Sequence, residues 1–135
     1  MEQMELRCPV LIKSKVTQDL KEHMTKEVRG RLDLVEQDLQ QIEFQAKRLL
    51  SEQAKIDAQG LISLRAQIEE NKEKLMQMKA QLTAEEKQIS ELELGSEIPR
   101  AQMERTVTVK VGDDLNQFMG AEILLEDGKI IAFRE

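Results

Sequence analysis

One pattern limits what this chain can fold into more than any other: through its middle, apolar side chains recur at alternating intervals of four and three residues. The first series comprises Val28, Leu32, Val35, Leu39, Ile42, Ala46, Leu49 and Ile56. The second series comprises Leu61, Leu64, Ile68, Leu75, Met78, Leu82, Ile89 and Leu92. Two apolar positions in every seven form a stripe that packs against a partner helix. The pattern predicts a helical coiled coil over residues 14–94.

A single break, Ala58-Gln59-Gly60, separates the two series. When the chain is folded back at this break, the two stripes match, so that Val28 lies opposite Ile89. We therefore expect a long antiparallel helical hairpin with its turn near residues 58–60. One continuous helix through the same segment remains the alternative.

Both ends of the chain have the alternation of β-strands. Every second residue from Leu6 to Ile12 is apolar, and Thr106–Val111 alternates strictly. Pro9 has no backbone N–H, so the first strand is expected at a sheet edge. Because a helical hairpin brings both ends together, residues 1–13 and 100–135 are predicted to form a small, mostly antiparallel β head. The expected fold class is α+β.

The dipeptide Asp127-Gly128 predicts a two-residue β-hairpin turn. Regular pairing from this turn sets Leu124 opposite Ile131. It also places Leu124, Ile131 and Phe133 on one face of the sheet, because side chains alternate between the faces.

The head is expected to be apolar on both faces of its sheet, since Ile123 and Leu125 point to the opposite side. A head of about 50 residues buries little core by itself. The second face is then covered by the segment 115–119, by the root of the helices or by another subunit. The last of these predicts a homo-dimer, or a larger assembly, with Leu124, Ile131 and Phe133 as the dimer contact.

Side chains that carry catalysis or bind metals are sparse. The single His and single Cys exclude a zinc finger and an intramolecular disulfide. His23 lies between Asp19 and Glu27 at helical spacing, but charged helices produce this arrangement commonly, and Cys8 is expected to be a buried apolar residue. The glycines form no phosphate-binding motif. We therefore expect a non-enzymatic protein with no catalytic residue, cofactor or metal.

Charge is unevenly distributed along the chain. The formal net charge is −6, yet residues 13–31 hold six basic and three acidic side chains. Lys21, Lys26, Arg29 and Arg31 are candidate anion- or RNA-contact residues at the root of the predicted stalk, as an RNA- or ribosome-associated factor would need. The acidic total and the aromatic content of 2% disfavour general nucleic-acid binding.

No apolar run approaches the roughly 20 residues that cross a membrane, and Met1–Glu5 lacks the basic and apolar segments of a signal peptide. We expect a soluble, cytoplasmic protein without a membrane partner. Near the predicted turn, Ile62 lies outside the apolar stripe and is a candidate contact at the tip of the stalk.

Several short segments resemble the YlqD family of small bacterial proteins, and the resemblance covers nearly the whole chain. These segments are Val10-Leu11-Ile12-Lys13, Val109-Lys110-Val111-Gly112-Asp113, Glu122-Ile123 and Asp127-Gly128-Lys129-Ile130. The resemblance implies a bacterial cytoplasmic protein and supplies no catalytic residues. The combination of paired helices and strands is also similar to prefoldin, a chaperone, although prefoldin subunits carry their strands between the helices.

The predicted function is that of a protein-interaction or assembly module that presents a coiled-coil stalk to a protein partner of unknown identity. The alternatives are the RNA- or ribosome-associated factor and a holdase-like chaperone.

Overall fold

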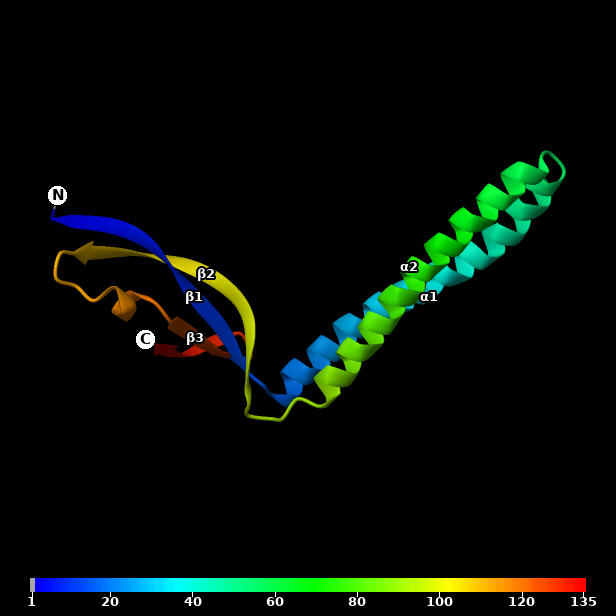
Figure 1. The fold of residues 1–135 in the computed structure, drawn as a ribbon. Helices are drawn as coiled ribbons and strands as arrows, with labels where there is room; N and C mark the ends of the chain where they lie inside the picture. The colour runs from blue at the N-terminus through cyan, green and yellow to red at the C-terminus, as the bar shows by residue number, and fades with distance from the viewer. Residues whose placement is uncertain (1) are drawn as a thin grey trace. The chain divides into compact units, whose positions relative to one another are not determined.

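A computed structural model of the chain describes residues 2–135; Met1, the first residue of the predicted head, lies outside this range. The fold is α+β, as predicted, and consists of two long helices and a four-stranded mixed sheet built from the N- and C-terminal segments (Figure 1). The chain divides into two compact units. One is His23–Glu91, and the other is formed by the residues on either side of it.

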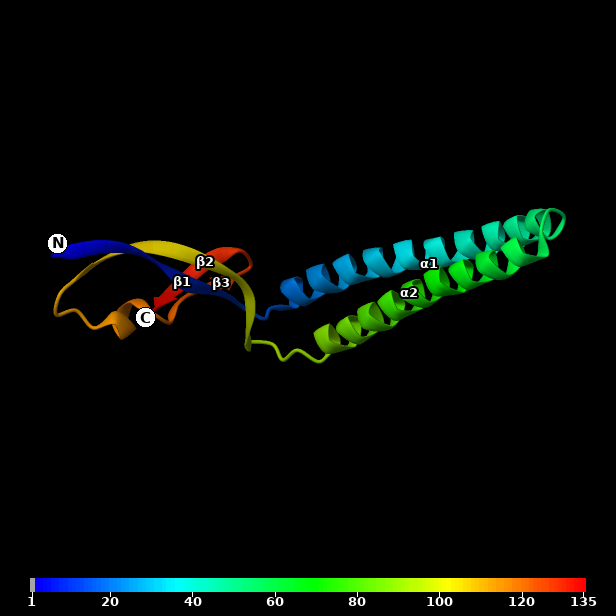
Figure 2. The same cartoon turned by 45° about the horizontal axis from the view of Figure 1, so that its top comes forward.

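The middle of the chain is an antiparallel hairpin of α1 (Gln18–Ala54) and α2 (Ala58–Ser90), whose helices lie side by side (Figure 2). The alternative of one continuous helix is wrong. Predicted stripe positions form the core: the buried residues are Val28, Leu32, Val35, Leu82 and Ile89, with Met24, Leu39 and Leu75 packed against them. Other stripe positions are more open, since Leu49 is 39% and Met78 is 48% exposed.

The turn between the helices lies at residues 55–57, slightly before the predicted residues 58–60. Asp57 caps α2, because its side chain accepts hydrogen bonds from the backbone N–H groups of Gln59 (3.0 Å) and Gly60 (3.2 Å). The capping aspartate therefore sets the start of the second helix, and Gly60 lies inside its first turn. Ile56, the last residue of the first apolar series, is 78% exposed.

The sheet has the order β2-β1-β3-β4. The strands are β1 (Gln3–Lys15), β2 (Glu97–Lys110), β3 (Ala121–Glu126) and β4 (Lys129–Arg134). β1 pairs antiparallel with β2 and parallel with β3, and β3 pairs antiparallel with β4. The connection between β2 and β3 therefore crosses β1, and it contains the short 3-10 helix η1 (Leu115–Phe118), capped by Asp114.

The prediction that the first strand lies at an edge is wrong, because β1 is central. Val111 N–H donates to the carbonyl of Glu2 (3.4 Å), and in an antiparallel ladder the direction of these groups alternates along the strand. The nitrogen of Pro9 therefore points away from β2. Pairing with β3 starts one residue later, at Val10 opposite Ala121. The missing N–H thus costs no hydrogen bond on either side.

A β-bulge in β4 corrects the predicted pairing of the last hairpin. Leu125 lies opposite Ile130 as expected, but Leu124 then pairs with Ala132 rather than with Ile131, which is the extra residue. An extra residue inverts the alternation beyond it. Leu124, Ile131 and Phe133 therefore do not share a face: Leu124 is buried, and Phe133 lies beside Ile123 and is 74% exposed.

The bulge also changes the character of the two faces of the sheet. Paired residues share a face, so the register defines an apolar face and a charged face. The apolar face carries Cys8, Val10, Ile12, Met103, Ile123, Leu125 and Phe133. The charged face carries Lys13, Glu97, Glu122 and Arg134, together with the apolar Leu11, Leu124 and Ala132. The second face is therefore mixed rather than apolar throughout, because Phe133 lies on the other face.

Removing the cap of α2 is expected to destabilise the hairpin. Asp57→Ala leaves two N–H groups without their acceptor and should lower the free energy of unfolding by about 1 kcal/mol. Urea denaturation followed by circular dichroism measures this loss. Asp57→Ser, which keeps a capping oxygen, is the matched control. Equal stability of the alanine variant and the wild type would contradict the assigned cap.

Candidate functional site

The apolar face contains a groove with a volume of about 460 Å³. Its floor is formed by two small buried side chains, Val10 and Ala121, which are 6% and 5% exposed. Met103 from β2 and Phe133 from β4 line the groove, and both are mostly exposed. The groove exists because small residues on β1 and β3 lie between long side chains on the two outer strands. Its lining suits an apolar side chain of a partner.

An ion pair joins β2 to the C-terminal residue at this groove. Arg105 Nη1 lies 2.9 Å from Glu135 Oε1, and both residues line the groove. Within residues 2–135, Arg105 Nε is buried and has no hydrogen-bond partner. The residues that line the groove include three glutamates, Glu104, Glu122 and Glu135, and no His, Cys, Ser or Thr.

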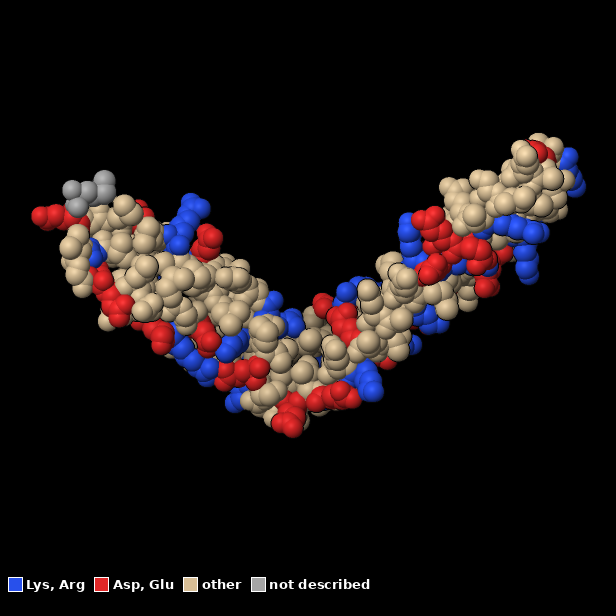
Figure 3. Space-filling model, in the orientation of Figure 1, with Lys and Arg blue, Asp and Glu red and all other residues tan. Residues whose placement is uncertain are grey.

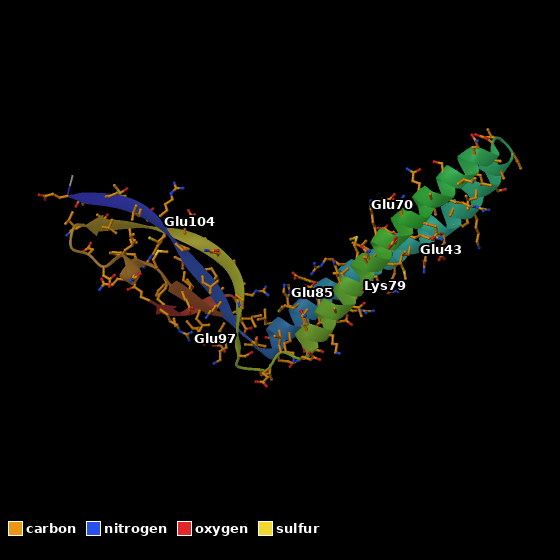
Figure 4. The ribbon with its side chains drawn as sticks, in the orientation of Figure 1. Glu43, Glu70, Lys79, Glu85, Glu97 and Glu104 are labelled. Carbon is orange, nitrogen blue, oxygen red and sulfur yellow. The ribbon has the colours of Figure 1, made fainter. Side chains whose placement is uncertain are left out.

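The charged face contains a linked set of ion pairs. Arg134 Nη2 lies 2.9 Å from Glu97 Oε2, and its Nη1 lies 3.7 Å from Glu122. Lys13 Nζ lies 2.9 Å from the other oxygen of Glu122. The hydrogen bond from Arg134 lowers the pKa of the Glu97 carboxyl, and the same bond raises the pKa of Arg134. Figure 4 shows Glu97 near the start of β2.

Two of the four predicted anion-contact residues form ion pairs within the hairpin. Arg29 and Arg31 each lie 3.3 Å from an acid of α2, Glu86 and Glu85 respectively. Lys21 donates to the carbonyl of Leu92 (2.9 Å) and belongs to the other unit. Lys26 is exposed. Two of the four cations are therefore neutralised by acids of the facing helix, including Glu85, which Figure 4 labels.

The other candidate residues are placed as follows. Ile62 is 71% exposed on the first turns of α2. His23 Nε2 lies 3.1 Å from Glu27 Oε1 on the exposed surface, and no group of three possible metal ligands occurs in the described part of the chain. Cys8 is buried and unpaired, as predicted.

Sequence reasoning missed the groove and the most exposed aromatic side chain of the hairpin. The groove depends on the bulge at Ile131, and no turn motif or glycine in the sequence predicts that bulge. Phe44 is 76% exposed and lies among four glutamines, Gln37, Gln40, Gln41 and Gln45. Its position outside the apolar stripe was the available signal, because an aromatic residue off the seam is left facing water.

An antiparallel helical hairpin inserted between the first two strands of a mixed four-stranded sheet defines the class of this protein. The model of the YlqD family, described as YlqD protein, matches residues 4–134, and the chain belongs to this family. Among curated proteins, no match to the chain was found.

A solved structure has the same fold. It is the crystal structure of a protein of unknown function from Synechococcus sp. WH 8102, with a TM-score of 0.77 and 22% sequence identity. The similarity covers 98% of this chain and 95% of that chain. At this identity, the likeness shows the fold alone. Within residues 2–135, neither helix combines the length and the apolar character that crossing a membrane requires.

Arg134→Gln tests the ion pairs of the charged face. The pKa of Glu97 is expected to rise toward its ordinary value of 4.5, because the variant removes the hydrogen bond to the carboxylate. A lowered pKa in the folded state stabilises the fold at neutral pH, and this stability is lost as the pH falls through the folded pKa. The stability difference between wild type and variant should therefore shrink in acid.

The carboxyl carbon of Glu97, followed by NMR over a pH titration, reports its pKa directly, and urea denaturation at neutral and acidic pH reports the stability. Arg100→Gln is the control, because it removes a charge from β2, the strand of Glu97, without touching the Arg134–Glu97 pair. An unchanged Glu97 pKa in Arg134→Gln would show that the pair has no effect in solution.

Proposed function

We propose that this chain is a non-enzymatic protein-interaction and assembly module, in which the head self-associates and the hairpin presents apolar side chains to a second protein. The observation that carries this proposal is a group of large apolar side chains left in water on the half of the hairpin that holds the turn. Phe44, Ile56 and Ile62 are 76%, 78% and 71% exposed.

The exposure of these residues is costly in a protein without a partner. Burying apolar surface is worth about 25 cal/mol per Å², so each such side chain forgoes on the order of 1–2 kcal/mol. Large apolar side chains that are exposed on one part of a protein surface often mark a binding site. On the face shown in Figure 3, uncharged side chains cover much of the turn-bearing end of the hairpin, with basic and acidic side chains at its margins. A protein partner that supplies its own apolar side chains fits this surface.

The function as an RNA- or ribosome-associated factor has less support. Arg29 and Arg31 already lie 3.3 Å from carboxylates of α2, which reduces the positive field that a phosphate backbone would meet. A holdase-like chaperone uses the same exposed apolar residues as the proposed module. It differs in accepting many unrelated clients, so the number of partners separates the two functions. The proposed setting is the bacterial cytoplasm, without a membrane partner or a cofactor.

The proposal predicts one stoichiometric protein partner that depends on the turn end of the hairpin. The immobilised full chain is incubated with bacterial lysate, half of it treated with nuclease, and bound proteins are identified by mass spectrometry. The partner should survive nuclease and be lost with the double variant Ile56→Lys and Ile62→Lys, because the new charges would be buried in the contact. Ser63→Lys, at an exposed neighbouring position, is the matched control and should keep it.

Other outcomes would contradict the proposal. Ribosomal or RNA-binding proteins that disappear after nuclease treatment, and with Arg29→Glu and Arg31→Glu, would support the RNA-associated factor. Suppressed aggregation of many unrelated clients, abolished by Ile62→Lys, would support the chaperone.

A further inference from the structure

We propose that the outer edge of β2 is the self-association site of the head, and that it pairs antiparallel with β2 of a second copy about a two-fold axis at Thr106. The inference rests on the proposed function, in which the head self-associates, and it assigns the surface. The four-stranded sheet of one copy would continue into that of the other. This is strand addition between identical edges, which gives a self-complementary two-fold interface.

The edge of β2 is long and unblocked over most of its length. β2 pairs only with β1, and a bulge at Arg100 beside Pro99 separates its start from the regular stretch Ala101–Lys110. Natural proteins protect edge strands with prolines, bulges or short length, because open N–H and C=O groups invite another strand. From residue 101 to residue 110, β2 has neither a proline nor a bulge.

The direction of each backbone group along this edge follows from one hydrogen bond. Val111 N–H donates to the carbonyl of Glu2, so odd-numbered residues of this stretch point toward β1 and even-numbered residues point outward. Within residues 2–135, the outward backbone groups of Gln102, Glu104, Thr106 and Thr108 make no hydrogen bond.

The free stretch ends at Lys110. The outward N–H of Lys110 donates to the side chain of Asp113 (2.8 Å), and its carbonyl accepts from Asp113 N–H (3.0 Å). The bulge at one end and this turn at the other leave a short ladder of four open positions, Gln102, Glu104, Thr106 and Thr108.

The opposite edge of the sheet is less suited to strand addition. β4 has six residues, begins with Lys129 and is interrupted by the bulge at Ile131. A bulge twists an edge and breaks the spacing of its hydrogen bonds. Of the three residues of the predicted dimer contact, Ile131 and Phe133 lie on this protected strand and Leu124 is buried on β3, while β2 offers a regular ladder.

Backbone geometry and charge choose the register. A two-fold axis perpendicular to the sheet keeps both apolar faces on one side, so even-numbered residues pair with even-numbered ones. An axis at Arg105 would set two arginines opposite each other, which is unfavourable. An axis at Val107 would place Glu104 opposite Lys110, whose backbone groups are already bonded. An axis at Thr106 avoids the pair of arginines and leaves the Thr106 pair and both Glu104–Thr108 pairs complete. Only the outermost pair, Gln102 with Lys110, meets the bonded backbone groups of Lys110.

The pairs across this register are complementary. They are Thr106 with Thr106, Glu104 with Thr108, Arg105 with Val107 and Met103 with Val109, and each even-numbered pair exchanges two hydrogen bonds. Lys110 lies diagonal to Glu104 of the second copy, at about 7–8 Å between backbones, which long opposite charges bridge. Met103, which is 61% exposed in one copy, gains an apolar neighbour. Figure 4 shows Glu104 on β2.

Cysteine cross-linking tests the register. In the proposed dimer the Thr106 Cα atoms lie about 5.5 Å apart, within the span of a disulfide. Thr106→Cys should therefore give a covalent dimer with diamide, which takes two protons and two electrons from the two thiols. Thr108→Cys, the matched control, should not, since its Cα atoms would lie about 14 Å apart. Wild type, with only the buried Cys8, should also give none.

Light scattering of the full chain at tens of micromolar gives the mass in parallel. We expect a two-copy mass for the wild type and for Thr106→Ala, and a one-copy mass for Thr106→Pro. The proline removes an outward N–H and leaves the hydrogen bonds between β1 and β2 intact. If Thr106→Pro does not fold, the comparison of Thr106→Cys with Thr108→Cys still tests the proposed register. A dimer without the Thr106→Cys cross-link would overturn the β2 edge and leave self-association through another surface. A monomer would overturn the edge and the proposed self-association together.

Discussion

The antiparallel pairing of β1 with β2 is the interaction on which the rest of the structure depends. It runs from Gln3 opposite Lys110 to Lys15 opposite Glu97, and the entire helical hairpin is inserted between these two strands. Joining strands so distant in sequence costs loop-closure entropy, which grows only slowly with loop length. The helices reduce this cost further, since an antiparallel hairpin already returns the chain to its starting point. Once β1 is fixed, its other side becomes the template for β3, and β3 for β4.

The head separates apolar and charged contacts onto opposite faces of one sheet. A single extra residue, Ile131, moves Phe133 beside Ile123 and turns Arg134 toward Glu97 and Glu122. The apolar side gains a groove, and the other side gains ion pairs that are partly exposed and therefore individually weak. These exposed pairs orient the end of β4 more than they stabilise the fold. The free energy of the head comes chiefly from β1, whose Cys8, Val10 and Ile12 are buried.

Much of this fold could be read from the sequence, because it depends on periodicity. The heptad spacing of Val28, Leu32 and Val35 identified the hairpin core, and Asp127-Gly128 identified the last turn. Features set by single backbone groups could not be read in the same way. Pro9 suggested an edge, but a proline is tolerated wherever its nitrogen points away from a partner, and that direction follows from the register. The bulge at Ile131 has no local sequence signature, so neither the groove nor the neighbours of Phe133 could be predicted.

The insertion of the hairpin between two paired strands has a consequence for how such proteins vary. Matched additions or deletions of seven residues in α1 and α2 would preserve the stripe of apolar contacts and return the chain to β2 at the same point. The reach of the helices and the surface chemistry of the sheet can therefore change independently. For protein engineering, this means that the length of the helical hairpin can be adjusted while the sheet is kept unchanged.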